Sequence, residues 1–192
     1  MKKKIILIGC GGHAKVCADV ILNNKKYKIS GLICNKKKKL KFPIIGKDKD
    51  LKKLRKIYKY AVIGVGQIKT STIRNRIFNN LKKLNFVLPV LKSKYSLISK
   101  GVKIEEGTVI MDGAIVHSNA KIGYNSIINT KAIIEHDVII GNNSHISTGV
   151  IVNGNVKIGN NVFIGSGSII VNDIKIKSNS FIKAGTVIKE NF

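Results

Sequence analysis

The sequence is short of cysteines and of long apolar runs, and each shortage excludes a class of protein. The 192 residues include three cysteines. An odd number excludes a small secreted scaffold built from disulfides and fits a reduced cytoplasm. No apolar run approaches the roughly 18 residues that a membrane-spanning helix needs. We therefore expect a cytoplasmic globular protein without a membrane span.

Acidic residues are also scarce, since 10 Asp and Glu stand against 35 Lys and Arg. Residues 1–95 hold 26 basic and 3 acidic residues, whereas residues 96–192 hold 9 and 7, and this break indicates two domains. The lysines fit either a codon-biased genome or a field that attracts an anionic ligand to the first half. Only 6% of residues are aromatic and none is tryptophan. Because base recognition favours arginine and single-strand binding needs stacking aromatics, we do not expect nucleic acid as a partner.

The second half carries an aliphatic residue at every sixth position. A period of six does not fit one stripe of an α-helix, but it fits a short strand and a turn repeated, with the aliphatic side chain pointing inward each time. Three such units would close a triangular coil, and the whole series would stack into about five coils of a β-solenoid. The series consists of Ile98, Ile104, Ile110, Val116, Ile122, Ile128, Ile134, Ile140, Ile146, Val152, Ile158, Ile164, Ile170, Ile176, Ile182 and Ile188.

The first half opens with a strand, a glycine-rich turn and a helix. Lys4 to Ile8 is an apolar strand, Gly9-Cys10-Gly11-Gly12-His13 follows, and apolar residues recur at helical spacing from Val16. In this layout the backbone N–H groups of a helix N-terminus can hold a phosphate. The spacing is not the full dinucleotide fingerprint, so a tight turn without a ligand stays open as the alternative.

Further segments complete a small α/β unit. Helices are expected at 51–57 and 68–84, and strands at 29–34, 60–63 and 86–88. The predicted fold is therefore a Rossmann-like α/β domain over residues 1–90, followed by a solenoid over residues 91–192.

This arrangement resembles the hexapeptide-repeat sugar acetyltransferases of the UDP-4-amino-sugar N-acetyltransferase and sialic acid O-acetyltransferase type. The resemblance spans nearly the whole chain and rests on the opening glycine motif, the six-residue repeat and Ile134-Glu135-His136-Asp137. It implies a left-handed parallel β-helix and a homotrimer. It also implies that acetyl-CoA lies along the solenoid between subunits and that the first domain holds a sugar or nucleotide sugar.

His136 is the candidate general base, because imidazole titrates near neutral pH and a neighbouring carboxylate orients it. The resemblance implies the same role and makes Asp137 the residue that raises its basicity. Glu135 is the alternative partner, because Asp is shorter than the Glu of some relatives. Gly154 lies one coil beyond His136, where it would leave room for a thioester and offer a backbone N–H to its carbonyl.

Two other kinds of chemistry are not expected. The cysteines all fall in the first domain, so direct transfer without an acyl-enzyme is predicted. His117 and His136 are one position out of register, so no three histidines converge on a metal and no metal site is predicted. His117 is expected at a surface corner.

The resemblance also implies contacts with both substrates. For the acceptor it points to Gly11, Gly12, His13, Cys34, Asn35 and Gly64, and for acetyl-CoA to His145, Ser166, Ala184 and Gly185. The turn after the second strand carries Asp in relatives but reads Cys34-Asn35-Lys36 here, where Lys36 to Lys39 could engage a diphosphate instead.

The predicted activity is transfer of an acetyl group from acetyl-CoA to the amino group of a nucleotide-linked amino sugar of the UDP-4-amino type. O-acetylation of sialic acid or a related sugar is one alternative. A non-catalytic solenoid that binds a nucleotide or sugar is the other.

Overall fold

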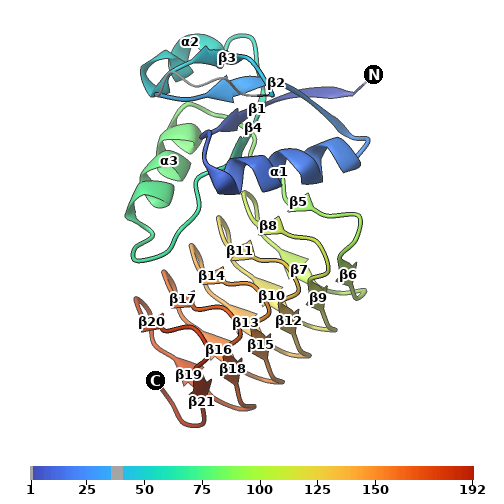
Figure 1. The fold of residues 1–192 in the computed structure, drawn as a ribbon, viewed down its shortest axis with the longest axis vertical. Coiled ribbons are helices and arrows are strands. Elements are labelled where there is room, and N and C mark those ends of the chain that lie inside the picture. The colour runs from blue at the N-terminus through green and yellow to red at the C-terminus, as the bar shows by residue number, and fades with distance from the viewer. Residues whose placement is uncertain (1, 36–40) are drawn as a thin grey trace.

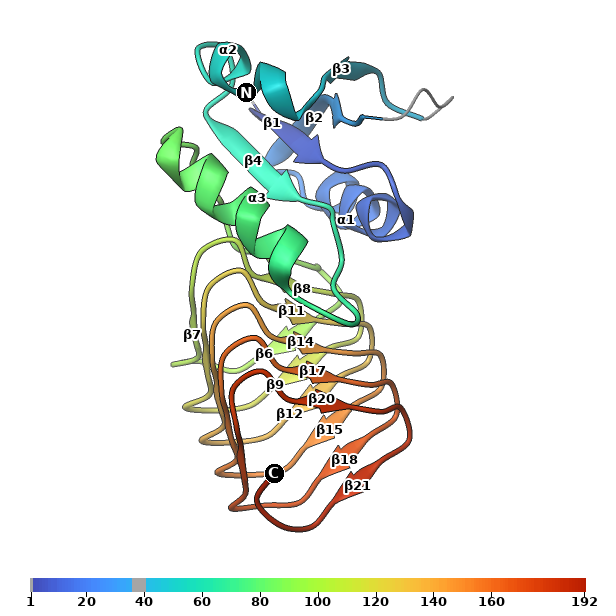
Figure 2. The same ribbon diagram turned by 90° about the vertical axis from the view of Figure 1, so that its left-hand side faces the viewer.

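The computed structural model describes residues 2–35 and 41–192. A small α/β domain stands on one end of a three-sided prism, and the chain winds down the prism to its C-terminus (Figures 1 and 2). No helix in the described part of the chain is long and apolar enough to cross a membrane.

The α/β domain is built on a parallel sheet with strand order β3-β2-β1-β4. Its β1 is buried on both faces, as a continuous apolar run predicts. Ile5 and Leu7 pack with helix α1, whereas Ile6 and Ile8 pack with residues of α2 and α3. The elements are β1 (Lys3–Ile8), α1 (Gly12–Asn23), β2 (Tyr27–Ile33), β3 (Ile44–Gly46), the 3₁₀ helix η1 (Asp48–Asp50), α2 (Leu51–Leu54), β4 (Tyr60–Ile63) and α3 (Thr72–Lys83).

The predicted strands and helices of this domain are present, with four differences. The helix expected at 51–57 ends at Leu54. β3 was not predicted, because three residues at the edge of a sheet leave no alternating pattern to detect. The last helix begins at Thr72 rather than residue 68. Val87 forms only an isolated bridge with Tyr60 in place of a full strand.

The solenoid consists of two-residue strands in three parallel sheets, with the orders β19-β16-β13-β10-β7, β20-β17-β14-β11-β8-β5 and β21-β18-β15-β12-β9-β6. This is the three-sided parallel β-helix that the six-residue period predicts. Its strands are β5 (Leu91–Lys92), β6 (Leu97–Ile98), β7 (Lys103–Ile104), β8 (Val109–Ile110), β9 (Ile115–Val116), β10 (Lys121–Ile122), β11 (Ile127–Ile128), β12 (Ile133–Ile134), β13 (Ile139–Ile140), β14 (His145–Ile146), β15 (Ile151–Val152), β16 (Lys157–Ile158), β17 (Phe163–Ile164), β18 (Ile169–Ile170), β19 (Lys175–Ile176), β20 (Phe181–Ile182) and β21 (Val187–Ile188).

Each strand pairs with the strand 18 residues further on, so that like residues stack. Ile128 lies beside Ile146, and Ile134 lies beside Val152. The aliphatic residue of each unit from Ile110 to Ile188 belongs to one continuous buried cluster. Burial of this aliphatic column is the main source of the solenoid's stability.

The corners of the prism also repeat every six residues, because each contains one residue with positive φ. Glycine reaches that conformation without strain, and Asn and Asp tolerate it better than other residues. Lys131 is the exception. The corner residues are Gly101, Gly107, Gly113, Asn119, Asn125, Lys131, Asp137, Asn143, Gly149, Asn155, Asn161, Gly167, Asp173, Asn179 and Gly185.

A buried arginine joins the two domains. Arg74 of α3 is 1% exposed, and burial lowers the pKa of its guanidinium to about 10, so it stays charged at neutral pH. Among the described residues the guanidinium donates hydrogen bonds only to backbone carbonyls, two at the end of β4 and two in the solenoid. These are Ile63 O (3.0 Å), Val65 O (2.8 Å), Asn125 O (3.0 Å) and Gly107 O (3.3 Å).

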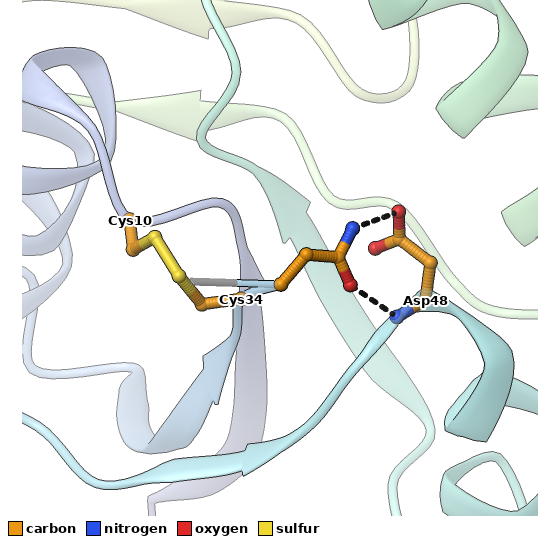
Figure 3. The surroundings of a disulfide bond; sticks show 4 residues. Cys10, Cys34 and Asp48 are labelled. Atoms are coloured by element: carbon orange, nitrogen blue, oxygen red, sulfur yellow. Dashed lines mark hydrogen bonds between the residues drawn. A yellow bond between two sulfur atoms is a disulfide. The ribbon is translucent and has the colours of Figure 1, made fainter. Parts of the chain in front are cut away.

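The cysteines differ from the expectation of three reduced thiols. Cys10 and Cys34 form a disulfide, with Cα atoms 5.8 Å apart (Figure 3). The pairing arises because β1 and β2 are neighbours in the sheet and the two cysteines follow their carboxyl ends. Cys17 is a buried thiol, and burial raises its pKa to about 12.

Truncating the inward residue of one strand should cost far more than truncating its outward neighbour. Ile140 is 2% exposed and Ile139 is 38% exposed. We expect Ile140→Ala to lower the free energy of unfolding by about 2–5 kcal/mol. The matched control Ile139→Ala should lower it by less than about 1 kcal/mol. Urea denaturation followed by circular dichroism measures both, and equal losses would contradict the assignment of faces.

Candidate active site

His136 lies in the turn between β12 and β13, with 63% of its side chain exposed. Its Nδ1 is 2.8 Å from Asp137 Oδ2, and the other carboxylate oxygen accepts a hydrogen bond from Asn119 Nδ2 at 3.1 Å. These hydrogen bonds, that of His136 first, hold the pKa of the Asp137 carboxyl below its usual range. The carboxylate therefore accepts a hydrogen bond from the Nδ1–H. This leaves Nε2 as the nitrogen without a proton.

Asp137, and not Glu135, contacts the His136 ring. Glu135 Oε1 lies 3.9 Å from Nε2 of His117 at the neighbouring corner. Asp137 occupies the positive-φ position of its turn, and this position directs a short carboxylate back onto the preceding imidazole. The geometry thus decides between the two carboxylates that the sequence left open.

Gly154 lies directly against the His136 ring, as the 18-residue coil predicts. A Cβ at Gly154 would stand 2.7 Å from both Nε2 and Cε1 of His136. Any side chain there would collide with the nitrogen that is free to act as a base. In the described part of the chain the Gly154 N–H has no hydrogen-bond acceptor. Its role in an acetyl pocket stays a prediction.

His145 lies on the outer face of β14, where the α/β domain covers the solenoid. Its Nδ1 is 2.6 Å from the Gln67 carbonyl oxygen, and its Nε2 is 3.1 Å from Asn129 Nδ2. Burial lowers the pKa of this imidazole to about 4, although the hydrogen bond to Gln67 opposes the shift. His145 is therefore neutral at pH 7, donating to Gln67 and accepting from Asn129.

A cavity of about 470 Å³ lies between the two domains. It is lined by His13, Val16, Gly66, Gln67, Ile68, Asn129 and His145. Two of its polar atoms, His13 Nε2 and Gln67 Oε1, are buried without a hydrogen-bond partner among the described residues. Burial, reinforced by Arg74 and His145, lowers the pKa of His13 to about 3. A polar ligand would satisfy both groups, because buried polar atoms are otherwise almost always paired.

Gln67 and Asn129 were not predicted as site residues. Gln67 stands just beyond the carboxyl end of a parallel strand, where ligand-binding residues gather in α/β sheets, so the sequence contained a signal for it. Asn129 directly follows β11 and leads into a turn like many others in the repeat. Nothing in the sequence distinguishes it.

The other residues predicted to bind acetyl-CoA lie away from His136 within one chain. Ser166, Ala184 and Gly185 are exposed at the corner that leads into β18 and β21. Ser166 Oγ is 2.9 Å from Ser147 Oγ. His136 follows β12, a strand of the same sheet. It therefore stands at the carboxyl ends of these strands, at the opposite edge of this face of the prism. One chain does not bring the two edges together.

The predicted acceptor residues lie in several different places. Gly11 and Gly12 begin α1, a Cβ at either would meet open space, and the helix start has no side-chain cap. His13 faces the cavity between the domains instead. Gly64 is explained by packing, because a Cβ there would stand 2.8 Å from the Cβ of Ala14.

Cys34 and Asn35 border a second cavity, of about 250 Å³, at the carboxyl ends of β1, β2 and β4. Lys36 to Lys39 lie outside the described residues. Within residues 2–35 and 41–192, no three His, Cys, Asp or Glu side chains are grouped so that they could hold a metal ion.

The two halves of the chain match two family models. Residues 4–81 match the PglD N-terminal domain, and residues 155–190 match the bacterial transferase hexapeptide repeats. No curated protein sequence matches the chain significantly.

Solved structures resemble almost the whole chain. The acetyltransferase domain of PglB from Neisseria gonorrhoeae, in complex with acetyl coenzyme A, is 29% identical over 98% of this chain and 93% of its own, with a TM-score of 0.90. PerB from Caulobacter crescentus, in complex with CoA and GDP-perosamine, is 24% identical over 98% and 90%, with a TM-score of 0.93. WeeI from Acinetobacter baumannii is 21% identical over 99% and 93%, with a TM-score of 0.83.

A PglD-type N-terminal domain, a hexapeptide-repeat solenoid and the likeness to acetyltransferase structures over nearly the full length agree with one another. The chain belongs to the hexapeptide-repeat sugar acetyltransferases, which are acetyl-CoA-dependent enzymes.

Proposed function

We propose that this protein transfers the acetyl group of acetyl-CoA to the amino group of a nucleotide-linked amino sugar of the UDP-4-amino type, with His136 as general base. The observation that carries the proposal is the His136 ring, held at Nδ1 by Asp137 and open at Nε2 beside Gly154. A similar structure binds acetyl coenzyme A, and another binds CoA and GDP-perosamine. We infer a domain that holds the acceptor over residues 1–90 and an acetyl-CoA-binding solenoid over residues 91–192.

The chemistry needs a base at the acceptor nitrogen and a donor at the carbonyl oxygen of the thioester. His136 Nε2 removes a proton as the amine attacks the carbonyl carbon, and the positive charge on the ring is stabilised by Asp137. The N–C bond forms, the C–S bond breaks, and the departing thiolate of CoA takes up the proton that His136 carries. The unpaired N–H of Gly154 is suited to the carbonyl oxygen, because it lies on the coil next to the base.

The cavity between the domains supplies polar groups for an uncharged ligand. His13 and His145 are neutral at pH 7, since burial lowers both pKa values far below neutrality. An acceptor sugar offers hydroxyl groups that can donate to Gln67 Oε1 and pair with His13 Nε2. We assign this cavity to the reacting end of the acceptor, beside the pantetheine arm that His145 is predicted to contact.

We infer that the active unit is a homotrimer, and the outer faces of the solenoid support this. The face containing β12 presents an aliphatic side chain at every coil, namely Leu97, Ile115, Ile133, Ile151, Ile169 and Val187. The face containing β13 presents Lys103, Lys121, Ile139, Lys157 and Lys175. An aliphatic stripe of this length is typical of a protein interface, whereas the lysine face suits solvent.

A trimer would also complete the site. Three aliphatic faces turned toward one axis place one edge of each face beside the opposite edge of the next. His136 of one copy would then stand beside Ser166, Ala184 and Gly185 of its neighbour, so the site would be built from two copies.

We place the reaction in the cytoplasm, where acetyl-CoA is available as an intracellular metabolite. Structural disulfides are rare in that compartment, so the Cys10–Cys34 pair would be exceptional there.

Release of free CoA thiol tests the activity directly. Wild-type protein should release thiol from acetyl-CoA with a UDP-4-amino or GDP-4-amino sugar and not with free sialic acid. His136→Ala should lower kcat by about 10²-fold or more, because a general base contributes that much. His117→Ala should leave kcat within twofold, because His117 lies one coil away and contacts Glu135 rather than the His136 ring. Equal rates for wild type and His136→Ala would refute the assignment, and thiol release only with sialic acid would make the enzyme an O-acetyltransferase.

Placing charges on the aliphatic face should dissociate the trimer. We expect Ile133→Lys combined with Ile151→Lys to sediment as a monomer and to lose activity while circular dichroism is preserved. Ile139→Lys on the lysine face should remain trimeric and active. In a shared site, coexpressing inactive His136→Ala with inactive His145→Ala should restore part of the activity. No recovery in trimers shown to be mixed would place both histidines in one copy's site.

Acid should destabilise the protein through its two buried histidines. The native pKa values are about 3 for His13 and about 4 for His145, against 6.5 for the ordinary imidazole. Below pH 6.5 the unfolded chain binds protons that the native chain does not. Stability should therefore fall as the pH drops from 6.5 toward 4, by up to about 1.4 kcal/mol per pH unit for each histidine.

Urea midpoints at pH 7, 6 and 5 measure this slope. His145→Gln should reduce it by about half, and His117→Gln should leave it unchanged. A slope that His145→Gln does not alter would contradict the neutral state of this imidazole.

A further inference from the structure

A carboxylate stands at the carboxyl end of β2, although it does not come from the turn that follows this strand. In parallel α/β folds an acidic residue at this position commonly binds a ribose hydroxyl. The turn here reads Cys34-Asn35, without an acid. In the folded chain Asp48 of η1 lies against Asn35, 13 residues away in the sequence.

Two hydrogen bonds hold Asp48 in place (Figure 3). Asn35 Nδ2 donates to Asp48 Oδ2 at 3.0 Å, and the Asp48 backbone N–H donates to Asn35 Oδ1 at 3.4 Å. Asn35 follows directly on the sheet, because the backbone N–H of the preceding Cys34 donates to the Gly46 carbonyl at 3.1 Å. Asn35 uses one oxygen of the carboxylate, whose four acceptor positions leave capacity for a ligand.

This carboxylate borders the cavity of about 250 Å³ at the carboxyl ends of β1, β2 and β4. In the strand order β3-β2-β1-β4 the chain adds β2 and β3 on one side of β1 and then β4 on the other side. Ligands of open α/β sheets bind in the crevice at such a point. Gly9, Cys10, Asp48 and Arg76 all line the cavity. It is separate from the cavity between the domains that holds His13 and His145.

We propose that Asp48 binds a ribose hydroxyl of the acceptor's nucleoside diphosphate, with Asn35 as the residue that positions it. This rests on the proposed function only in taking the acceptor to be nucleotide-linked. The backbone N–H groups at the start of α1 and the guanidinium of Arg76 then serve the diphosphate, since both suit phosphate oxygens. The sugar extends from there toward the solenoid.

The charges favour a hydroxyl as the partner of Asp48. A carboxylate beside a diphosphate repels it, so an acidic residue in this crevice weakens nucleotide binding unless the ligand donates a hydrogen bond to it. A hydroxyl on the ribose donates one, whereas a phosphate at neutral pH does not. Removing the charge of Asp48 should therefore strengthen binding of the diphosphate if the carboxylate only repels it, and weaken binding if the carboxylate accepts a hydrogen bond from the ribose. This difference makes the proposal testable.

The test is isothermal titration calorimetry of the full-length protein with UDP and GDP. The tighter of the two is then compared with its 2′,3′-dideoxy form. Wild type should bind the ribose form about tenfold or more tightly, because a hydrogen bond to a charged group is lost in the dideoxy form. Asp48→Asn should bind the ribose form about tenfold more weakly than wild type, and its preference for ribose should fall to about threefold or less, because the amide oxygen is only a neutral acceptor.

Asp50→Asn is the matched control, because it removes the same charge from the same 3₁₀ helix. Asp50 Oδ2 accepts the Lys47 backbone N–H at 2.8 Å and does not line the cavity. It should bind the diphosphate as tightly as wild type or slightly more tightly, and it should keep the preference for ribose. If both variants lost affinity for the diphosphate, the loss would come from a perturbed η1. This result would overturn the proposal.

The remaining outcomes separate this proposal from the proposed function. Failure of both diphosphates to bind wild type at millimolar concentration would overturn the proposal, and so would an Asp48→Asn variant that keeps the full wild-type preference for ribose. If thiol release is normal in either case, the acetyltransferase assignment stands without Asp48. If ribose recognition depends on Asp48 but no amino sugar supports thiol release, the nucleotide site stands and the proposed reaction falls.

Discussion

Backbone pairing between residues 18 apart is the constraint on which the rest of the structure depends. It stacks each inward aliphatic residue on its equivalent in the next coil, and it places residues with positive φ at every corner. The same register puts Gly154 against His136 and Asn119 beside Asp137. The geometry around His136 is therefore a consequence of coil length. A position that could hold any side chain in another coil can hold only glycine where the neighbouring coil carries the imidazole.

The junction of the two domains imposes a second constraint, because it is polar and buried. Arg74 donates hydrogen bonds to four backbone carbonyls, and His145 donates one to the carbonyl of Gln67. Both contacts hold the segment after β4, which also lines the cavity between the domains. An unpaired charge or carbonyl in such a place is costly, so the orientation of the α/β domain on the solenoid is strongly specified.

Each chain presents two edges of one aliphatic face, with the proposed base His136 at one edge and the predicted pantetheine contacts at the other. In the proposed mechanism neither edge is a complete site in one chain. The aliphatic side chains between them therefore link the oligomeric state to the proposed chemistry. By contrast the crevice beside Asp48 lies wholly within one α/β domain, so nucleotide binding and acetyl transfer depend on different contacts.

The sequence by itself determined the solenoid, its 18-residue coil, the α/β domain before it and the approach of Gly154 to His136. These follow from periods and local patterns, and a repeat converts sequence spacing directly into distance. Only the tertiary structure decided that Asp137 rather than Glu135 holds the ring, that Cys10 pairs with Cys34, and that Asp48 meets Asn35. Each of these depends on a side-chain direction or on segments brought together by the sheet, and no local pattern records such contacts.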